Sequence, residues 1–296
     1  MIKYEWRDHL DTDESAELAE MLVRAAAYDA EPEYNTIDFA DVQATLGTRN
    51  TRHLLIWRLP RTATSGFADD SHQIAGLLRL VFTSDTAADA TVVIDPKARS
   101  IGILTMLLEQ LGVGVNNTDG WAGIGAHTVS AWSRGNHPAA GRLSDRFLIP
   151  RTRRTWKLIR AAVPDETVMS APVLESLDSP ALAEIDWANG AETTGTVLAL
   201  REAGHLVGLL SLDRQPVESP EFGACATIAC VAYSRFTESA AVQRMLAGAT
   251  AATRDAGLGG IAIYVDSDDS TLVNACRLSG FQHDRTNVGY QLGEPR

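Results

Sequence analysis

The sequence predicts an α+β protein built from two copies of one domain, and three observations lead to this fold class. The chain has 296 residues, of which 45% are hydrophobic, a length that suggests one large domain or two ordinary ones. Residues 161–172 (AAVPDETVMSAP) carry two prolines and show no clear period, which is typical of a linker. The order of helical and strand patterns before this segment nearly repeats after it. We therefore expect domains at 1–160 and 173–296, joined by a linker at 161–172.

The first half begins with helical patterns and continues with strands. Apolar residues recur at helical spacing in 14–27 and, more briefly, in 37–46. On the first helix we expect Glu14, Glu17 and Glu20 to form a solvated face. Three short β-rich runs separated by turn residues predict neighbouring antiparallel strands at 53–60, 74–82 and 91–95. A helix opening just past Gly102, a strand at 121–127, a helix from His137 and a strand at 156–160 complete this half.

The second half repeats most of this order. We expect a helix at 182–190, strands at 196–202, 206–212 and 225–233, a long alanine-rich helix at 239–256, a strand at 261–266, a helix at 271–279 and a strand at 288–292. The period is too long for a solenoid, so two copies of one domain explain the pattern more simply.

Composition limits the partners and the compartment. The formal net charge is -12, which repels phosphate backbones and anionic lipid, so we expect neither nucleic acid nor a membrane as a partner. The start MIKYEWRDHLDTDE has acids where a signal peptide needs an apolar run, and no stretch approaches the roughly 20 apolar residues of a spanning helix. We expect a cytoplasmic protein that is a monomer.

The cysteines and histidines indicate no metal site. Cys225, Cys230 and Cys276 show no C-x-x-C spacing, and the seven histidines form no H-E-x-x-H pattern. We expect buried thiols, no disulfide framework and no metal.

Several stretches carry a resemblance to a known family. They are YEWRDHL, TRHLLIW, VVIDPKARSIGI, GNHPAAGRLSDRF with TWKLIR, and IYVDSDDSTLVNACRLSGF with VGYQL. With the element order, they resemble the acetyl-CoA-dependent, GCN5-related N-acetyltransferases (GNAT), and more narrowly the actinobacterial mycothiol synthase family, over nearly the whole chain. The resemblance implies two tandem GNAT-type domains, each a mixed, mostly antiparallel sheet flanked by helices. In such a domain the fourth and fifth strands would splay to admit the pantetheine arm of acetyl-CoA.

The resemblance also implies a reaction and a coenzyme loop. The reaction is transfer of acetyl from acetyl-CoA to a small-molecule amine, the cysteinyl amine of cysteinyl-glucosaminyl-inositol, in the last step of mycothiol synthesis. The superfamily binds the pyrophosphate at a helix N-terminus through Arg/Gln-x-x-Gly-x-Gly/Ala, whose small residues let the backbone approach the phosphates. Arg99 and Gly102 fit this pattern, and Leu104 stands at its last small position. The implied coenzyme-binding residues are Val92, Val93, Ile94, Arg99, Ser100, Ile101, Gly102, Ile103, Leu104, Thr105, Asp269 and Ser270.

The second half departs from the family at several sites. Residues 234–243 contain no glycine, and Glu238 adds a negative charge where a phosphate loop is expected; we interpret it as an acid that complements a helix dipole. Cys225 occupies the position of the family's catalytic carboxylate, and Cys276 that of the tyrosine acid, so Cys276 is the candidate catalytic residue. The resemblance makes Tyr264 and Asn35 candidate substrate contacts.

These departures leave three hypotheses open. The leading one is acetylation of cysteinyl-glucosaminyl-inositol. The second is a catalytically degenerate descendant that binds a ligand or partner in the old cleft. The third is acetylation of a different amine by the N-terminal half.

Overall fold

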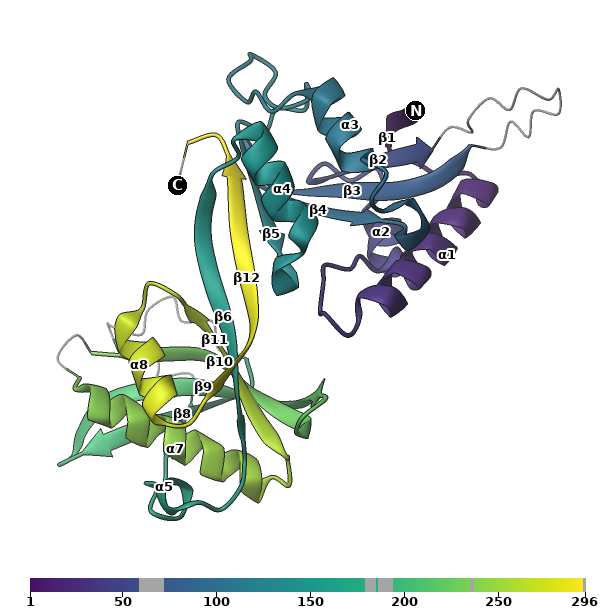
Figure 1. The fold of residues 1–296 in the computed structure, drawn as a ribbon. Coiled ribbons are helices and arrows are strands. Elements are labelled where there is room, and N and C mark those ends of the chain that lie inside the picture. Colours follow the sequence, from purple (N-terminus) through teal and green to yellow (C-terminus); the bar gives the residue numbers. More distant parts are fainter. Residues whose placement is uncertain (59–71, 179–184, 186–193, 235–236, 295–296) are drawn as a thin grey trace, which may run out of the picture. The chain divides into compact units, whose positions relative to one another are not determined.

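The structure is a computed structural model that describes residues 1–58, 72–178, 185, 194–234 and 237–294 (Figure 1). The chain forms two compact units, which we call unit 1 (Met1–Arg153 with Asn287–Arg296) and unit 2 (Arg154–Thr286). The sequence pattern places the division at 161–172. In the structure it falls inside the strand Arg151–Ala161, and the chain end returns to unit 1 because its last strand pairs there.

Unit 1 contains helices on both faces of a mixed sheet. Its elements are β1 (Ile2–Arg7), α1 (Thr12–Asp29), α2 (Phe39–Thr45), β2 (Thr51–Arg58), β3 (Gln73–Ser84), β4 (Ala87–Ile94), the 3-10 turn η1 (Pro96–Ala98), α3 (Ile103–Leu111), β5 (Thr128–Ser133), η2 (Arg134–Asn136), α4 (Pro138–Phe147), and the adjoining parts of β6 (Arg151–Ala161) and β12 (Gln282–Leu292). The strand order is β1-β2-β3-β4-β5-β12. Of these neighbours β4 and β5 run parallel, and the other neighbouring pairs are antiparallel.

Alternation along β2 divides the core of unit 1 into two layers. Leu54 and Ile56 pack in one cluster with Ile103 and Leu107 of α3. Their neighbours Leu55 and Trp57 pack in the other cluster with Leu18, Met21 and Leu22 of α1. This is the period of two expected for a strand whose faces are both covered, so each face of the sheet carries a helix layer.

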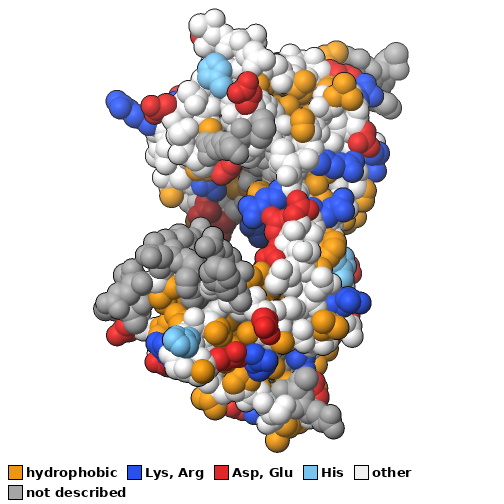
Figure 2. All heavy atoms as spheres, turned by 90° about the vertical axis from the view of Figure 1, so that its left-hand side faces the viewer, with side chains coloured by type: hydrophobic (Ala, Val, Ile, Leu, Met, Phe, Trp, Pro, Cys, Tyr) orange, Lys and Arg blue, Asp and Glu red, His pale blue; other side chains and the backbone are white. Residues whose placement is uncertain are grey.

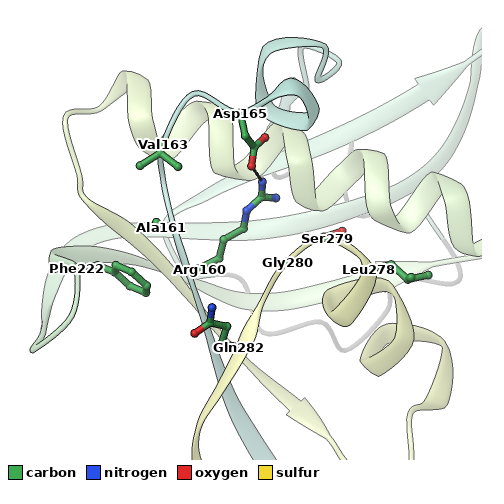
Figure 3. Close-up of a pocket in the computed structure, with 9 residues that line it drawn as sticks. All are labelled: Arg160, Ala161, Val163, Asp165, Phe222, Leu278, Ser279, Gly280 and Gln282. Atoms are coloured by element: carbon green, nitrogen blue, oxygen red, sulfur yellow. Dashed lines mark hydrogen bonds and ion pairs between the residues drawn. The ribbon is translucent and has the colours of Figure 1, made fainter.

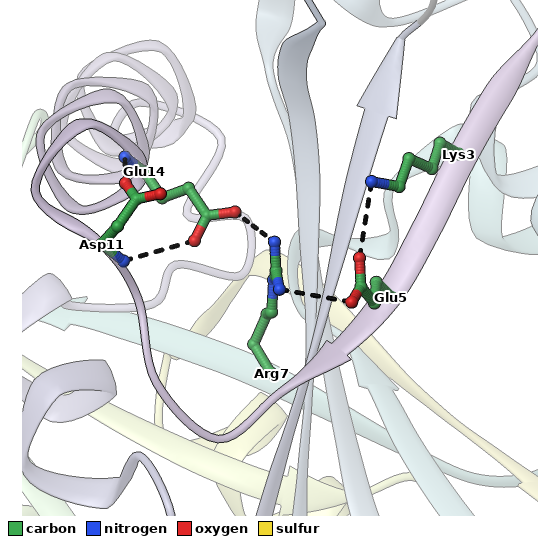
Figure 4. Close-up of polar contacts among 5 residues, drawn as sticks. All are labelled: Lys3, Glu5, Arg7, Asp11 and Glu14. Atoms are coloured by element: carbon green, nitrogen blue, oxygen red, sulfur yellow. Dashed lines mark hydrogen bonds and ion pairs between the residues drawn. The ribbon is translucent and has the colours of Figure 1, made fainter.

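The first turn of α1 is fixed to β1 by a short polar chain (Figure 4). Asp11 caps the helix by accepting the amide N–H of Glu14 at 2.8 Å, and the carboxylate of Glu14 accepts the N–H of Asp11 at 3.3 Å, which completes a capping box. Arg7 on β1 donates to both Glu14 and Glu5, and Lys3 lies 3.5 Å from Glu5. Glu14 is therefore an anchor of the helix start and not the solvated residue that the sequence suggested.

Unit 2 repeats the plan with a sheet ordered β6-β11-β10-β9-β8-β7. Its further elements are α5 (Glu166–Met169), β7 (Glu175–Leu177), β8 (Thr196–Glu202), β9 (His205–Ser219), β10 (Gly223–Tyr233), α7 (Ser239–Asp255), β11 (Gly260–Asp266) and α8 (Ser270–Leu278). One sheet face packs on α7 and α8 in a cluster that includes Leu210, Leu246 and Ala275. The strands β10 and β11 run parallel, as β4 and β5 do in unit 1.

Most predicted elements are present, and one prediction is wrong. Residues 121–127 form turns, not a strand: Gly123 and Gly125 take φ values of +73° and +83°, which extended backbone cannot use. The strand of this region is β5, one residue later. The sequence also missed β1, β7 and the short helix α5, which lies inside the expected linker. The predicted helix at 182–190 lies outside the described residues.

Candidate functional site

In unit 1 the parallel strands β4 and β5 pair at one end and part at the other. Their paired residues run from Ala87 and Thr128 to Ala90 and Ala131. Beyond this point Val92, Val93 and Ile94 stay paired with β3 alone. The edge of β4 that faces β5 is therefore open along these three residues, where an extended ligand could add its own hydrogen bonds. These three residues are among those that the family resemblance assigns to coenzyme binding.

The loop after β4 leads into a helix whose N-terminus has no side-chain cap. Ser100 and Gly102 both take the left-handed conformation, with φ of 65° and 82°. Gly102 is the N-cap of α3 and carries no side chain to bond the first-turn amides. The first N–H groups of a helix have no acceptor within the helix, and they attract anions. The amides of Ile103, Leu104 and Thr105 therefore have no acceptor within the helix, and a phosphate could bind them.

Leu104 does not crowd this site. Its side chain packs against the cluster beneath α3, together with Ile103, which is 3% exposed. A Cβ added to Gly102 would meet no atom within 4 Å, so the space in front of the helix is open. The large residue at the last position of the motif therefore packs into the cluster and leaves the space beside Gly102 free.

The side chain of Arg99 is turned toward α1. Its Nη1 and Nη2 each donate to the carboxylate of Asp29 at 2.6 Å, and its Nε donates to the carbonyl of Ile94 at 3.0 Å. The hydrogen bond to Asp29 is the main cause of the raised pKa of Arg99. Arg99 therefore contributes its backbone to the loop, while its guanidinium is occupied. Lys97, which the sequence motif does not include, is an exposed cation of this loop.

The segment after α1 reaches the far side of the opening. Asn35 Oδ1 accepts the N–H of Arg134 at 2.9 Å, just after β5. The ring of Tyr34 lies 4.4 Å from that of His137, the N-cap of α4. His137 Nδ1 accepts the N–H of Ala139 at 3.1 Å, so the neutral ring carries its proton on Nε2. Burial, followed by the charge of Arg99, lowers the pKa of His137. Asn35 is thus placed beside the unit 1 opening.

Unit 2 has the corresponding opening. Its parallel pairing runs from Cys225 and Gly260 to Ile228 and Ile263. Tyr264 follows directly on β11 and is 46% exposed. Cys225 lies at the paired end, 2% exposed, so it does not face the gap.

A side-chain bond crosses the unit 2 opening. The hydroxyl of Tyr233, at the end of β10, lies 3.2 and 3.3 Å from the two carboxylate oxygens of Asp269, just after β11. Burial, with the charge of Asp269, raises the pKa of Tyr233 to about 12. Asp269 also accepts the N–H of Leu272 at 3.0 Å and so caps α8, whose first residue is Ser270. The carboxylate of Asp269, a predicted cofactor residue, is therefore already occupied by the Tyr233 hydroxyl and by the start of α8.

Two further features of unit 2 weigh against coenzyme binding and against catalysis there. Glu238 is the exposed N-cap of α7 and places an acid at the helix start that would meet the phosphates. Cys276 is 0% exposed within the core cluster, and its burial raises the pKa of the thiol to about 12. This thiol cannot reach a ligand while the core is intact.

A cavity of about 360 Å³ lies at the other end of the unit 2 strands (Figure 3). Its lining includes Arg160, Phe222, Gly280 and Gln282. The guanidinium of Arg160 pairs with the carboxylate of Asp165. Ala161, which also lines it, pairs with Gly260 at the closed end of β11, so this cavity is separate from the opening beside Tyr264.

The described residues offer neither a metal site nor a membrane-spanning helix. Among them no group of three or more His, Cys, Asp or Glu side chains could hold a metal ion. No described helix is long and apolar enough to cross a membrane. On the face in Figure 2, Lys and Arg side chains lie next to Asp and Glu side chains, without one large basic patch.

The parted parallel strands in each unit define the class of fold. The chain can be superposed on a GCN5-related N-acetyltransferase from Sphaerobacter thermophilus with a TM-score of 0.57 at 14% identity, covering 97% of this chain and 95% of the other. A tandem GNAT protein from the clavulanic acid biosynthesis pathway gives a TM-score of 0.61 at 11% identity over the full length of both chains. The fold is thus that of a tandem GNAT protein, as the sequence predicted.

The sequence comparisons point to one kind of enzyme. A mycothiol acetyltransferase from Paenarthrobacter aurescens is 24% identical over 95% of this chain and 93% of its own length. A second, from Saccharomonospora viridis, is 24% identical over 99% of this chain and 100% of its own length. No protein-family model matches the chain. These findings confirm the resemblance stated from the sequence and support acetyl transfer in general.

Proposed function

We propose that this protein is an acyl-CoA N-acetyltransferase that binds acetyl-CoA in unit 1. The observation that carries the proposal is the combination of the free β4 edge at 92–94 with the uncapped N-terminus of α3 behind Gly102. The pantetheine arm would extend β4 as an added strand, and the pyrophosphate would accept the first-turn amides of α3. Lys97 is placed to add a cation.

The chemistry is a direct acyl transfer. The lone pair of the acceptor amine attacks the thioester carbonyl carbon, a C–N bond forms, the C–S bond breaks, and coenzyme A leaves as a thiolate that takes up a proton. The ammonium of the acceptor loses one proton to a base before attack and another as the amide forms. The proton that the amine releases as the amide forms balances the one that the coenzyme A thiolate takes up.

We propose the cysteinyl amine of cysteinyl-glucosaminyl-inositol as the acceptor. Support comes from the similarity to two mycothiol acetyltransferases over nearly the whole of all three chains. In this assignment Asn35, beside the unit 1 opening, remains the candidate substrate contact of the acetylating unit. Tyr264 lies at the opening of unit 2 and remains a candidate contact for a ligand of that unit.

The test is an acetylation assay with the purified chain, acetyl-CoA and this amine, in which released thiol and acetylated product are both measured. We expect one product per thiol, and loss of activity in Gly102→Asp with retention in Glu238→Gln. Absence of product under conditions where a mycothiol acetyltransferase from another source is active would reject the acceptor assignment.

A second candidate is favoured by the state of unit 2, where the resemblance places the family's catalytic carboxylate and tyrosine at the positions of Cys225 and Cys276. The bond between Tyr233 and Asp269 and the burial of Cys276 suit a unit that no longer carries out chemistry. Under this alternative unit 1 acetylates another primary amine. A panel of amines offered with acetyl-CoA separates the two candidates, because only the alternative gives turnover without the inositol-containing acceptor.

A further inference from the structure

The loop that follows β4 is fastened to α1 by two arginine–carboxylate pairs that run in opposite directions. Arg24 on α1 donates to both oxygens of Asp95 in the loop, at 3.3 Å from Nε and 2.6 Å from Nη2. Asp29, the last residue of α1, accepts both Nη groups of Arg99 in the loop, each at 2.6 Å. Each element supplies one cation and one anion, and both contacts have the two-bond geometry of strong arginine–carboxylate pairs.

Both carboxylates are shielded from water. The side chains of Asp95 and Asp29 are 8% and 3% exposed, and that of Arg99 is 17% exposed. Burial alone would raise the pKa of Asp95, but hydrogen bonds from Arg24 and from the amide of Lys97 lower it overall. The ring of Tyr28 lies 5.2 Å from the guanidinium carbon of Arg99. Directional bonds thus fix the positions of all four groups.

The pairs bracket the turn that precedes the phosphate site. Asp95 and Arg99 stand at the two ends of η1, and the chain then passes through Ser100 to Gly102 at the start of α3. Arg99 also bonds the carbonyl of Ile94, so one guanidinium ties the end of β4 and the end of α1 together.

We propose that Arg24, Asp29, Asp95 and Arg99 are positioning residues that hold loop 95–102 in its coenzyme-binding conformation before the coenzyme arrives. Arg99 acts through Asp29 and not on the phosphates. This inference rests on the proposed function of unit 1. Its physical basis is preorganisation: a loop already held in the bound conformation spends less binding free energy on being ordered.

The holding of the loop is tested first, without coenzyme. Amide hydrogen exchange is measured on the whole protein for the original chain, Asp29→Asn, Arg24→Gln and the control Glu14→Gln. Glu14 has an ion pair with Arg7 at the opposite end of α1, so the control loses a contact of the same helix that does not touch the loop. We expect faster exchange in peptides covering 95–106 for the first two variants and an unchanged rate there for the control. Unchanged exchange in both loop variants overturns the proposal.

The consequence for binding is tested by calorimetry with acetyl-CoA at two salt concentrations. Positioning predicts that Arg99→Gln and Asp29→Asn each weaken binding by about tenfold, that the double variant is no weaker than either, and that the salt dependence is unchanged. A direct phosphate contact predicts instead that Asp29→Asn keeps or strengthens binding, while Arg99→Gln weakens it and reduces the salt dependence. That second pattern overturns the proposal.

The two claims fail separately. If the original chain binds no acetyl-CoA, the proposed function fails, and the exchange experiment still decides whether the pairs hold the loop. Arg24→Gln keeps the test usable if Asp29→Asn does not fold, because the Arg24 side chain is 35% exposed and its loss leaves the buried Asp29–Arg99 pair intact.

Discussion

Replacing Gly102 by Asp places a carboxylate at the N-terminus of α3, where the pyrophosphate is proposed to bind. The left-handed φ of 82° adds strain of about 1 kcal/mol for any other residue, and a new Cβ meets no atom within 4 Å. A carboxylate about 5 Å from a phosphate charge adds about 3 kcal/mol of repulsion at an effective dielectric of about 20. We therefore expect acetyl-CoA to bind roughly 100-fold more weakly to Gly102→Asp.

The matched control is Gly102→Asn, which has the same size and backbone strain without the charge. We expect it to lose less than about tenfold in calorimetric affinity. Gly112→Asp is a second control, since Gly112 lies at the C-terminal end of α3 with φ of 73° and open space around it. Equal affinities for the Asp and Asn variants, or an equal loss in Gly112→Asp, would refute the placement of the phosphates.

Three further predictions concern stability and the roles of buried groups. Burial, with the charge of Arg79, lowers the pKa of His53 to about 4; because an unfolded His titrates near 6.5, the unfolded chain takes up the proton first as the pH falls. The contribution of neutral His53 to the free energy of unfolding is therefore complete above about pH 6.5 and is lost as the pH falls toward 4. We expect urea unfolding to show a loss of up to about 3 kcal/mol over this range. An equally steep loss in His53→Gln would contradict this. Cys276→Ala removes a fully buried thiol, so we expect about 1–2 kcal/mol of lost stability and an unchanged acetylation rate. Loss of acetylation in a variant that is still folded would instead support Cys276 as a catalytic residue. In Gly248→Ala the new methyl would lie 2.9 Å from the carbonyl oxygen of Pro172 and 2.7 Å from Leu174 Cγ. We therefore expect a lower urea midpoint, although alanine gains about 1 kcal/mol in helix propensity over glycine. A higher midpoint would show that α7 is packed differently.

Local sequence patterns predict the elements that local physics determines. The helices α1, α3 and α7 follow from apolar spacing, and α4 begins at Pro138, one residue after the predicted start at His137. The turn before α3 follows from Gly102, whose positive φ a side chain would strain. The opening at 92–94 follows from family resemblance, since no local pattern shows that two parallel strands part.

The rest depends on contacts between residues far apart in the chain. Glu17 looks like a surface acid of a helix, yet its carboxylate accepts the N–H of Ile74 at 2.8 Å. The sequence motif assigns Arg99 to the phosphates, because nothing near it in sequence shows that Asp29 occupies its guanidinium. The boundary between the units differs from the expected linker because β12 returns to pair with β5, which lies far earlier in the chain.

The central claim is that unit 1, and not unit 2, holds the coenzyme. The most direct test is amide hydrogen exchange of the whole chain with and without saturating acetyl-CoA, because it locates binding in one experiment. If unit 1 holds the coenzyme, exchange slows in peptides covering 91–106 and does not change in those covering β10 and the start of α7. Protection of the unit 2 peptides, or none at 91–106, would contradict it.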